Sequence, residues 1–196
     1  MPNRYDQIAP HYEQGIQLFE RWLIGRLRQE VFRLLPASGR ILEVGAGTGL
    51  NFPCYSPSAH GVASEPSWEM LRIARRKTRP GAVALSQNSA EELPFASGSF
   101  EAAFATLVFC TVHSPERAFA EIRRVVRSGG KLVLLEHVRP TGLLGPIFDV
   151  LNLVTVPLFS DHLNRRPAEL ARAAGLEVIS VRRSARGIIN LIECRV

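Results

Sequence analysis

Apolar runs and helix-like patterns alternate along this chain. Largely apolar runs lie at residues 41–44, 99–107 and 131–136. Runs of this kind are typical of strands that are buried on both faces of a parallel sheet. Shorter runs predict four more strands, at residues 59–64, 82–86, 176–181 and 188–194.

Helical patterns fill the intervals between these runs. Ser67 can cap one helix, Ser114 and Pro115 begin another, and Gly175 closes a third at residues 167–174. A short helix is also expected from residue 50 to residue 54, and residues 128–130 read as the turn that ends the helix begun at Ser114. Strands that alternate with helices predict an α/β doubly wound fold. Because the sequence has no repeat or linker, we expect residues 1–196 to form a single domain.

Two apolar flanks lie outside this alternation. Residues 15–35 predict a helix with several arginines, within an N-terminal helical lid at residues 1–38. This helix either packs on the domain, or it covers the active site or touches a membrane. Residues 138–164 are less regular and strongly apolar. They form either a helix that covers the core or a wall for a hydrophobic acceptor, which could dip into a membrane interface.

A glycine-rich turn follows the first strand. Glu43 precedes Gly45, Gly47 and Gly49 in an E-x-G-x-G-x-G pattern. Glycines let the backbone turn tightly and approach a nucleotide-like ligand closely. A dinucleotide fingerprint needs a third glycine where this chain has Leu50, which argues against a nicotinamide-dependent oxidoreductase. A carboxylate in the turn favours a ligand with a cationic end and disfavours a pyrophosphate.

A second acid follows about 20 residues later. Glu65 ends the second strand, where a carboxylate can accept hydrogen bonds from two ribose hydroxyls. In a doubly wound sheet, ligands bind outside the carboxyl ends of the strands. The two acids together predict a ligand with a ribose, an adenine and a cationic end, and with no phosphate.

Four segments together resemble the class I S-adenosylmethionine-dependent methyltransferases. They are residues 42–49, 89–95, 99–101 and 122–131. The resemblance implies a Rossmann-like, doubly wound, seven-stranded and mostly parallel sheet. Its last strand would be antiparallel, and helices would cover both faces. It also implies S-adenosylmethionine as the cofactor. The chain departs from the family at Ser89, where Asp is usual, and at Ser128, where Pro is usual.

The same resemblance assigns cofactor contacts to the ends of four strands. Those at the methionine part are Glu43, Gly45, Ala46, Gly47, Gly49, Thr106 and Leu107. Those at the ribose and adenine are Glu65, Pro66, Ser67, Met70, Ser89, Ala90 and Glu91.

Within the family, residues 106–112 and 135–138 resemble the branch that acts on small molecules. This branch includes membrane-associated thiol methyltransferases, bacterial phospholipid N-methyltransferases, and ubiquinone and menaquinone C-methyltransferases. We therefore expect a small, apolar or lipid-like acceptor. Residues 105–108 lack the Asn/Asp-Pro-Pro motif of base and glutamine methylation, and Cys110 does not follow a proline. A cofactor-binding protein without transferase activity stays an alternative.

A protonated acceptor also needs a general base. The candidates are His137 and His113, after the fifth and fourth main strands. Asp161 and His162 are further options, and His11 and Tyr12 could reach the site from the lid. A thiol acceptor could ionise without such help.

Composition adds limits on partners and compartment. The net charge of +6 indicates either a well-solvated basic surface or an anionic partner such as a membrane. Three scattered cysteines favour a reducing cytoplasm without disulfides or a zinc site. No apolar run reaches the roughly 18 residues of a membrane span. We expect a cytoplasmic protein that binds no metal and no nucleic acid and that can contact a membrane. The sequence predicts no oligomeric state.

Overall fold

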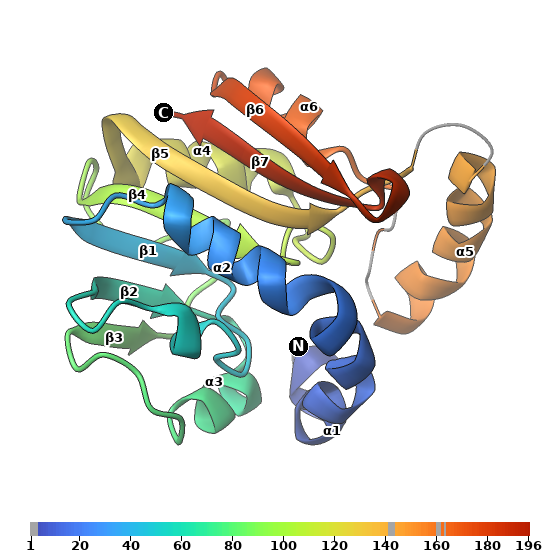
Figure 1. Ribbon diagram of the computed structural model, residues 1–196, viewed down its shortest axis with the longest axis horizontal. Coiled ribbons are helices and arrows are strands. Elements are labelled where there is room, and N and C mark those ends of the chain that lie inside the picture. Colours follow the sequence, from blue (N-terminus) through green and yellow to red (C-terminus); the bar gives the residue numbers. More distant parts are fainter. Residues whose placement is uncertain (1–3, 141–143, 160–161, 163) are drawn as a thin grey trace.

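A seven-stranded sheet forms the centre of the protein (Figure 1). The computed structural model describes residues 4–140, 144–159, 162 and 164–196. The strand order is β3-β2-β1-β4-β5-β7-β6. The strands are β1 (Arg40–Val44), β2 (His60–Ser64), β3 (Val83–Ser86), β4 (Phe100–Thr106), β5 (Val126–His137), β6 (Glu177–Ser184) and β7 (Ile189–Arg195). The first five strands pair in parallel, and β7 runs antiparallel to both of its neighbours, which confirms the predicted doubly wound sheet.

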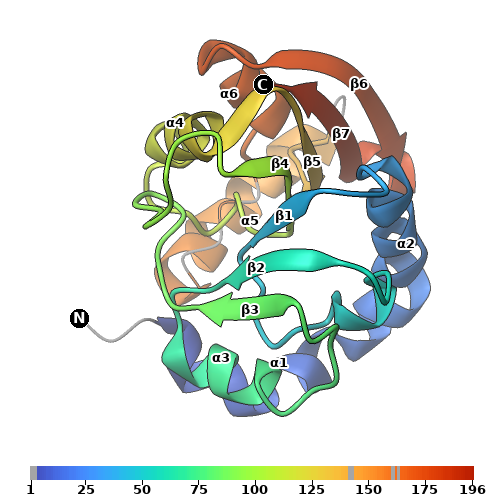
Figure 2. The same cartoon turned by 90° about the vertical axis from the view of Figure 1, so that its left-hand side faces the viewer.

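Helices cover both faces of the sheet (Figure 2). They are α1 (Arg4–Phe19), the π-helical turn η1 (Glu20–Ile24), α2 (Gly25–Leu34), the short 3-10 helix η2 (Phe52–Cys54), α3 (Trp68–Ala74), α4 (Pro115–Val125), α5 (Leu144–Phe159), α6 (Pro167–Ala173) and the 3-10 helix η3 (Ala185–Gly187). In Figure 2, α4 and α6 lie on one side of the sheet and α2 lies on the other.

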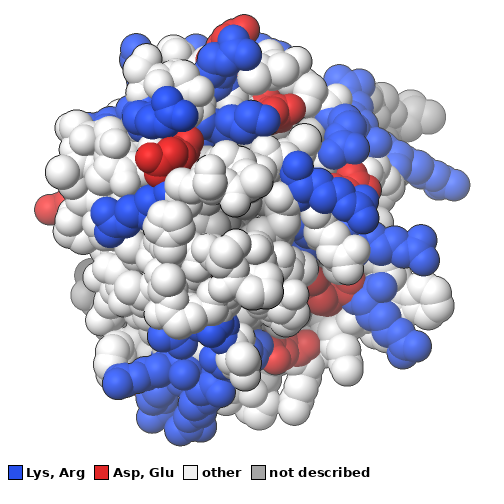
Figure 3. All heavy atoms as spheres, turned by 60° about the vertical axis from the view of Figure 1, so that its left-hand side comes forward, with Lys and Arg blue, Asp and Glu red and all other residues white. Residues whose placement is uncertain are grey.

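The surface reflects the net charge of +6. Figure 3 shows Lys and Arg side chains spread over one face of the molecule, with fewer Asp and Glu side chains among them.

Side chains at alternating positions of the strands pack into two apolar layers, one on each face of the sheet. Leu42 and Leu134 pack with Phe119 of α4 on one face of the sheet. Ile41 and Leu135 pack with Val31 of α2 on the other face. The period of two along a strand sends neighbouring residues to opposite faces, so continuous apolar runs are needed to fill both layers.

The N-terminal helix differs from the sequence-based expectation. It begins at Arg4 and not near residue 15, and it contains Pro10 in its interior. Proline removes a hydrogen bond inside a helix, so the helical signal of this segment is weak in sequence. The helix packs beside α3, and its Asp6 accepts hydrogen bonds from Ser67 Oγ and from the Glu69 amide. These contacts hold a segment that has little local preference for helix.

Three other local expectations also need correction. Residues 128–130, expected to form a turn, belong to β5 because Gly129 N donates to Val196 O and Val196 N donates to Gly130 O. Residues 50–54 contain only the three-residue η2, which ends where Tyr55 adopts an extended backbone. The apolar segment after β5 contains the 16-residue helix α5, as one of its two alternatives predicted, but Val150 and Leu153 of this helix are exposed and cover no core.

Helix α5 lies beyond the carboxyl end of β5 and stands apart from the sheet (Figure 1). Arg139 anchors it, because its Nε and Nη2 atoms donate to the Asp149 carboxylate at 2.9 and 2.7 Å. Val150 and Leu153 of α5 are 64% and 73% exposed, so these side chains cover no core. Within the described ranges, no helix is long and apolar enough to cross a membrane.

Candidate functional site

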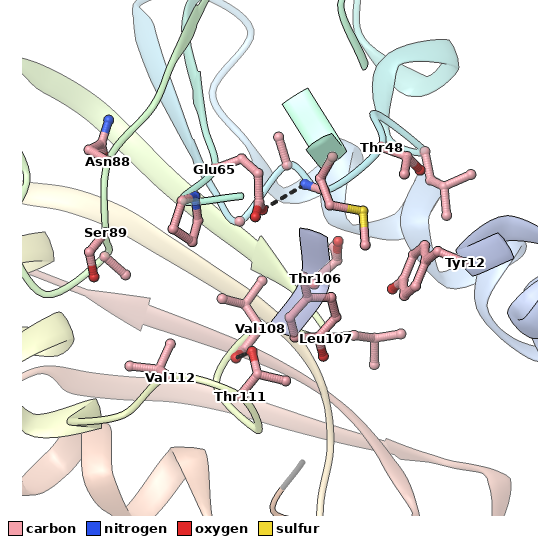
Figure 4. A pocket seen from close by; sticks show the side chains of 18 of the residues that line it. Tyr12, Thr48, Glu65, Asn88, Ser89, Thr106, Leu107, Val108, Thr111 and Val112 are labelled. Atoms are coloured by element: carbon pink, nitrogen blue, oxygen red, sulfur yellow. Dashed lines mark hydrogen bonds between the residues drawn. The ribbon is translucent and has the colours of Figure 1, made fainter. Parts of the chain in front are cut away.

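A cavity of about 260 Å³ lies at the carboxyl ends of the parallel strands. Its walls come from the glycine turn after β1, the end of β2, residues 88–91, the segment after β4, and helices α1 and α2 (Figure 4). This is where doubly wound sheets bind their ligands. The sequence-predicted residues that line it are Gly45, Ala46, Gly47, Glu65, Pro66, Met70, Ser89, Ala90, Glu91, Thr106, Leu107 and His113.

Gly47 forms the part of the turn that faces the cavity. Its φ is +55°, and a Cβ atom built on it would meet no atom within 4 Å. Residues with a side chain rarely adopt this conformation, whereas glycine does so without cost. The open space beside Gly47 is what a ligand needs to approach the backbone closely.

Glu65 lies at the end of β2 and is 7% exposed. Its two carboxylate oxygens accept hydrogen bonds from Gly47 N at 3.0 Å and from Ser67 N at 2.9 Å. Burial raises the pKa of Glu65 to about 7, although the two amide donors act in the opposite direction. Figure 4 shows the side chain beside the glycine turn and directed into the cavity. The group can therefore change its charge near neutral pH.

Glu43 does not line the cavity. Its side chain is fully buried beneath the glycine turn, where it accepts from Asn51 Nδ2 at 2.6 Å and from Tyr55 Oη at 2.7 Å. Burial raises the pKa of this carboxyl. Glu43 therefore holds the glycine turn in place, and it can affect a ligand only through its neighbours. Gly49 and Ser67, two other predicted contact residues, also lie outside the cavity lining.

Arg28 of α2 brings a buried positive charge to the cavity wall. Its Nη1 donates to Asn51 Oδ1 at 2.7 Å and to Thr106 Oγ1 at 2.8 Å. Its Nε and Nη2 donate to the Glu20 carboxylate at 2.5 and 2.9 Å. The residue is only 4% exposed and was not predicted as a site residue. The sequence held one sign that Arg28 is buried: it falls on the same helical face as the apolar residues Ile24 and Val31.

The turn after β4 forms the opposite wall. Leu107 adopts a φ of +58°, which is uncommon for a residue with a branched side chain. The buried Glu136 of β5 holds this turn, since its Oε1 accepts from Val108 N at 2.9 Å and from Phe109 N at 3.1 Å. The strain at Leu107 thus lies at the wall of the cavity, where functional sites often keep it.

The segment at residues 88–91 lines a third side. Glu91 Oε1 accepts from Ser114 N at 2.9 Å, and Ser89 Oγ accepts from Glu91 N. Asn88 donates from Nδ2 to Ser86 Oγ, but its buried Oδ1 has no hydrogen-bond partner among the described residues. A buried acceptor of this kind is costly unless a ligand supplies a donor.

The candidate bases occupy different places. His113 lies on the cavity wall and is exposed to solvent. His137, His162 and His11 are not among the lining residues, and Asp161 lies outside the described residues. Tyr12 does reach the cavity from α1 (Figure 4), and burial raises its pKa to about 12. At neutral pH the Tyr12 hydroxyl is therefore a proton donor and not a base.

Several lining residues were not predicted from the sequence. They are Tyr5, Arg28, Thr48, Leu50, Asn88, Val108, Thr111 and Val112. Most come from loops or from the N-terminal helices, whose position over the sheet depends on tertiary packing. No group of His, Cys, Asp and Glu residues in the described part of the chain could hold a metal ion.

The cavity fits the parts of S-adenosylmethionine. Glu65 offers a carboxylate to the ribose hydroxyls, Asn88 Oδ1 offers an acceptor to an amine, and Arg28, although paired with Glu20, places its guanidinium in the wall where a ligand carboxylate could lie. An open glycine turn and a doubly wound sheet complete the set. The fold and the cavity together define the class of nucleotide-like ligand binders to which methyltransferases belong.

Comparisons with known proteins name the family. Residues 42–134 match the methyltransferase domain family. A phosphatidylethanolamine N-methyltransferase of Cereibacter sphaeroides is 35% identical over 133 residues, which are 61% of this chain and 66% of that protein. A demethylmenaquinone methyltransferase of Thermus thermophilus is 34% identical over 157 residues, 74% of this chain and 70% of that protein. The chain thus spans about two thirds of the length of these relatives.

A solved structure agrees with these relatives. A methyltransferase of Thermotoga maritima has a TM-score of 0.77 and 25% identity, over 98% of this chain and 97% of that chain. The chain therefore belongs to the S-adenosylmethionine-dependent methyltransferases. S-adenosylmethionine is the cofactor of this family, as the resemblance of the four sequence segments implied.

Proposed function

We propose that the protein transfers a methyl group from S-adenosylmethionine to a small, apolar or lipid-like acceptor. The single observation that carries this proposal is the apolar wall of the cavity opposite Glu65. Leu107, Val108 and Val112 supply this wall, next to the place where the cofactor would lie. Ligand sites that are largely apolar with a few placed polar groups bury an apolar ligand well.

The polar groups of the cavity would orient the cofactor. Glu65 would accept from the ribose hydroxyls, and Asn88 Oδ1 would accept from the adenine amine in place of the Asp that Ser89 replaces. Arg28 would face the methionine carboxylate. When bound, the cofactor supplies an electrophilic methyl group on its sulfonium. The protein would align an acceptor with that methyl group and exclude water, and such alignment can supply about 7–11 kcal/mol of the barrier reduction.

Three acceptor classes are compatible with this site. The two relatives described above are named for a phospholipid amine and for a quinol-type acceptor. The resemblance of residues 106–112 to thiol methyltransferases adds a thiol. Amines and quinols carry a proton that must leave, and His113 is the candidate base that lies on the cavity wall. A general base of this kind typically contributes about 10²–10⁴-fold.

Exposed apolar side chains on the N-terminal helices support a lipid-like acceptor. Helix α1 and η1 supply Tyr12 to the cavity and also expose Leu18 (72%) and Trp22 (78%). Arg21 lies 5.8 Å from the centre of the Trp22 ring, so a cation and an aromatic side chain lie together there. Pairs of this kind suit the headgroup level of a membrane.

A vesicle assay tests the membrane contact. Wild-type protein should co-sediment with anionic vesicles at low salt, and Trp22→Ser should reduce the bound fraction. Trp68→Ser is the matched control, because Trp68 is also exposed (52%) but lies on α3. Equal loss for both variants, or no binding by the wild type, would contradict the membrane contact and leave the methyl transfer proposal intact.

A labelled-methyl screen tests the transfer itself. Purified protein and S-adenosylmethionine with a labelled methyl group are incubated with phosphatidylethanolamine vesicles, a demethylated quinol, or an apolar thiol. The expected result is label in one of these products, with a lower rate for His113→Ala when the acceptor carries a proton. Cofactor binding without labelling of any acceptor would support a binding protein without transferase activity and overturn the proposal.

A further inference from the structure

A second cavity of about 340 Å³ lies where the loop after β5 meets the start of α6 and the end of the β6–β7 hairpin. It is within the range of about 300–1,000 Å³ that is usual for ligand pockets. Its lining includes four arginines from three parts of the chain: Arg139 after β5, Arg166 and Arg172 at the two ends of α6, and Arg183 of β6. The proposed methyl transfer uses none of these residues.

The charges around this cavity are unbalanced. Among the described residues of its lining, Glu169 alone is acidic, and it pairs with Arg166 at 3.2 Å. Arg139 is neutralised by Asp149 of α5. The side chains of Arg172 and Arg183 have no hydrogen-bond or ion-pair partner among the described residues. Two guanidinium groups therefore remain available to an anion, and their planar donors match carboxylate and phosphate oxygens.

Asn190 of β7 gives an independent sign of a ligand. The residue lines the same cavity and is 9% exposed. Its Oδ1 atom is buried and has no hydrogen-bond partner within the described part of the chain. Buried polar atoms are nearly always paired, so this position calls for a partner. An amide offers an acceptor to a P–OH group or, after a half-turn, two donors to a phosphate oxygen.

The cavity also adjoins the proposed active site. A third cavity shares His113 with the cofactor cavity and shares Arg166 and Glu169 with the arginine-lined cavity. The three cavities thus follow one another along the same edge of the sheet. An anion held between Arg172 and Arg183 would lie at the same edge of the sheet as the cofactor cavity.

We propose that the cavity lined by Arg139, Arg166, Arg172, Arg183 and Asn190 is a binding site for a phosphoryl group. Phosphate fits better than a carboxylate because it offers three or more acceptor oxygens to donors that surround it from several directions. The phosphoryl group can belong to a lipid headgroup or to a free phosphate compound. The site does not depend on which acceptor is methylated.

A titration with inorganic phosphate at low ionic strength tests the site. Isothermal titration calorimetry compares the wild type with Arg172→Gln/Arg183→Gln and with the control Arg76→Gln/Arg127→Gln. Arg76 and Arg127 are exposed arginines outside the cavity, so the control removes the same charge elsewhere. The variant without the two cavity arginines, Arg172→Gln/Arg183→Gln (the cavity pair), should bind phosphate about 100-fold more weakly, because two charge-assisted hydrogen bonds disappear. The control pair should stay within about threefold, since it loses only a distant, screened charge.

A second arm identifies the source of the phosphate. The same variants are sedimented with vesicles that contain phosphatidic acid and with vesicles of phosphatidylcholine alone. If only the Arg172→Gln/Arg183→Gln variant loses binding to phosphatidic acid vesicles, the site exists and its ligand is a lipid headgroup. If this variant loses affinity for inorganic phosphate but binds the vesicles like the wild type, the site exists and its ligand is a free phosphate compound. Equal phosphate affinity in the wild type and the cavity pair overturns the proposal, as does equal loss in both pairs. Unchanged binding of S-adenosylhomocysteine shows that each variant is folded.

Discussion

The charge of Glu65 should make cofactor affinity depend on pH. Its pKa is about 7 in the free protein because burial disfavours the carboxylate. Ribose hydroxyls donate hydrogen bonds, so they bind the ionised form. Protonation therefore competes with the cofactor, and affinity falls as the pH drops through 7. With a pKa of about 7, roughly nine tenths of the groups are ionised at pH 8 and one tenth at pH 6, which gives about tenfold weaker binding at pH 6.

Calorimetric titration with S-adenosylhomocysteine at pH 6, 7 and 8 measures this effect. This compound is the cofactor after it has lost its methyl group, so it binds without reacting. Glu65→Gln should bind more weakly at pH 8 and should lose the tenfold dependence. His113→Gln is the matched control, since His113 also lines the cavity but does not approach Glu65 in the hydrogen-bond network. Equal wild-type affinity at pH 6 and pH 8, or a Glu65→Gln variant that keeps the dependence, would refute the reasoning.

Three further changes test the groups around the cavity. Arg28→Lys keeps the charge but loses most of the hydrogen bonds to Glu20, Asn51 and Thr106. Urea unfolding should therefore show that the free energy of unfolding falls by about 1–3 kcal/mol. An unchanged unfolding midpoint would contradict a stabilising role of this network. Ser67→Ala removes the side chain that caps α3 and donates to Asp6, and thermal unfolding should report a loss of about 0.5–2 kcal/mol. Gly47→Ala places a Cβ into the cavity at a φ of +55°, at a cost of about 1 kcal/mol. It should also weaken S-adenosylhomocysteine binding, and full affinity in calorimetry would place the ligand elsewhere.

Much of the sheet could be predicted from the sequence because its signals are local. Residues 41–44 and 99–107 are largely apolar runs, and the structure places strands there that fill both apolar layers. The helix that Ser67 begins was also predicted, and its Oγ accepts from Met70 N as a helix cap should. Helix caps and apolar periodicity are set by neighbouring residues, so they can be predicted without the rest of the chain.

The parts that were missed depend on tertiary contacts. Helix α1 carries Pro10, and its position is set by Asp6 and its partners on α3. Arg28 reads as a surface residue until its partners Asn51 and Thr106 are brought to it from two other segments. Glu43 was expected at the ligand because of its spacing from Gly45, yet its contacts with Asn51 and Tyr55 turn it away from the cavity. Spacing along a strand places a residue near a site, but packing decides which side of the turn its side chain occupies.

A crystal structure with S-adenosylhomocysteine tests the central claim most directly. The claim is that the cavity at the carboxyl ends of the parallel strands holds the cofactor, with Glu65 at the ribose, Asn88 at the adenine and Arg28 at the methionine carboxylate. We predict ligand density in this cavity, with both ribose hydroxyls within hydrogen-bond distance of the Glu65 carboxylate. Ligand density at another place, or a ribose that points away from Glu65, would contradict the claim.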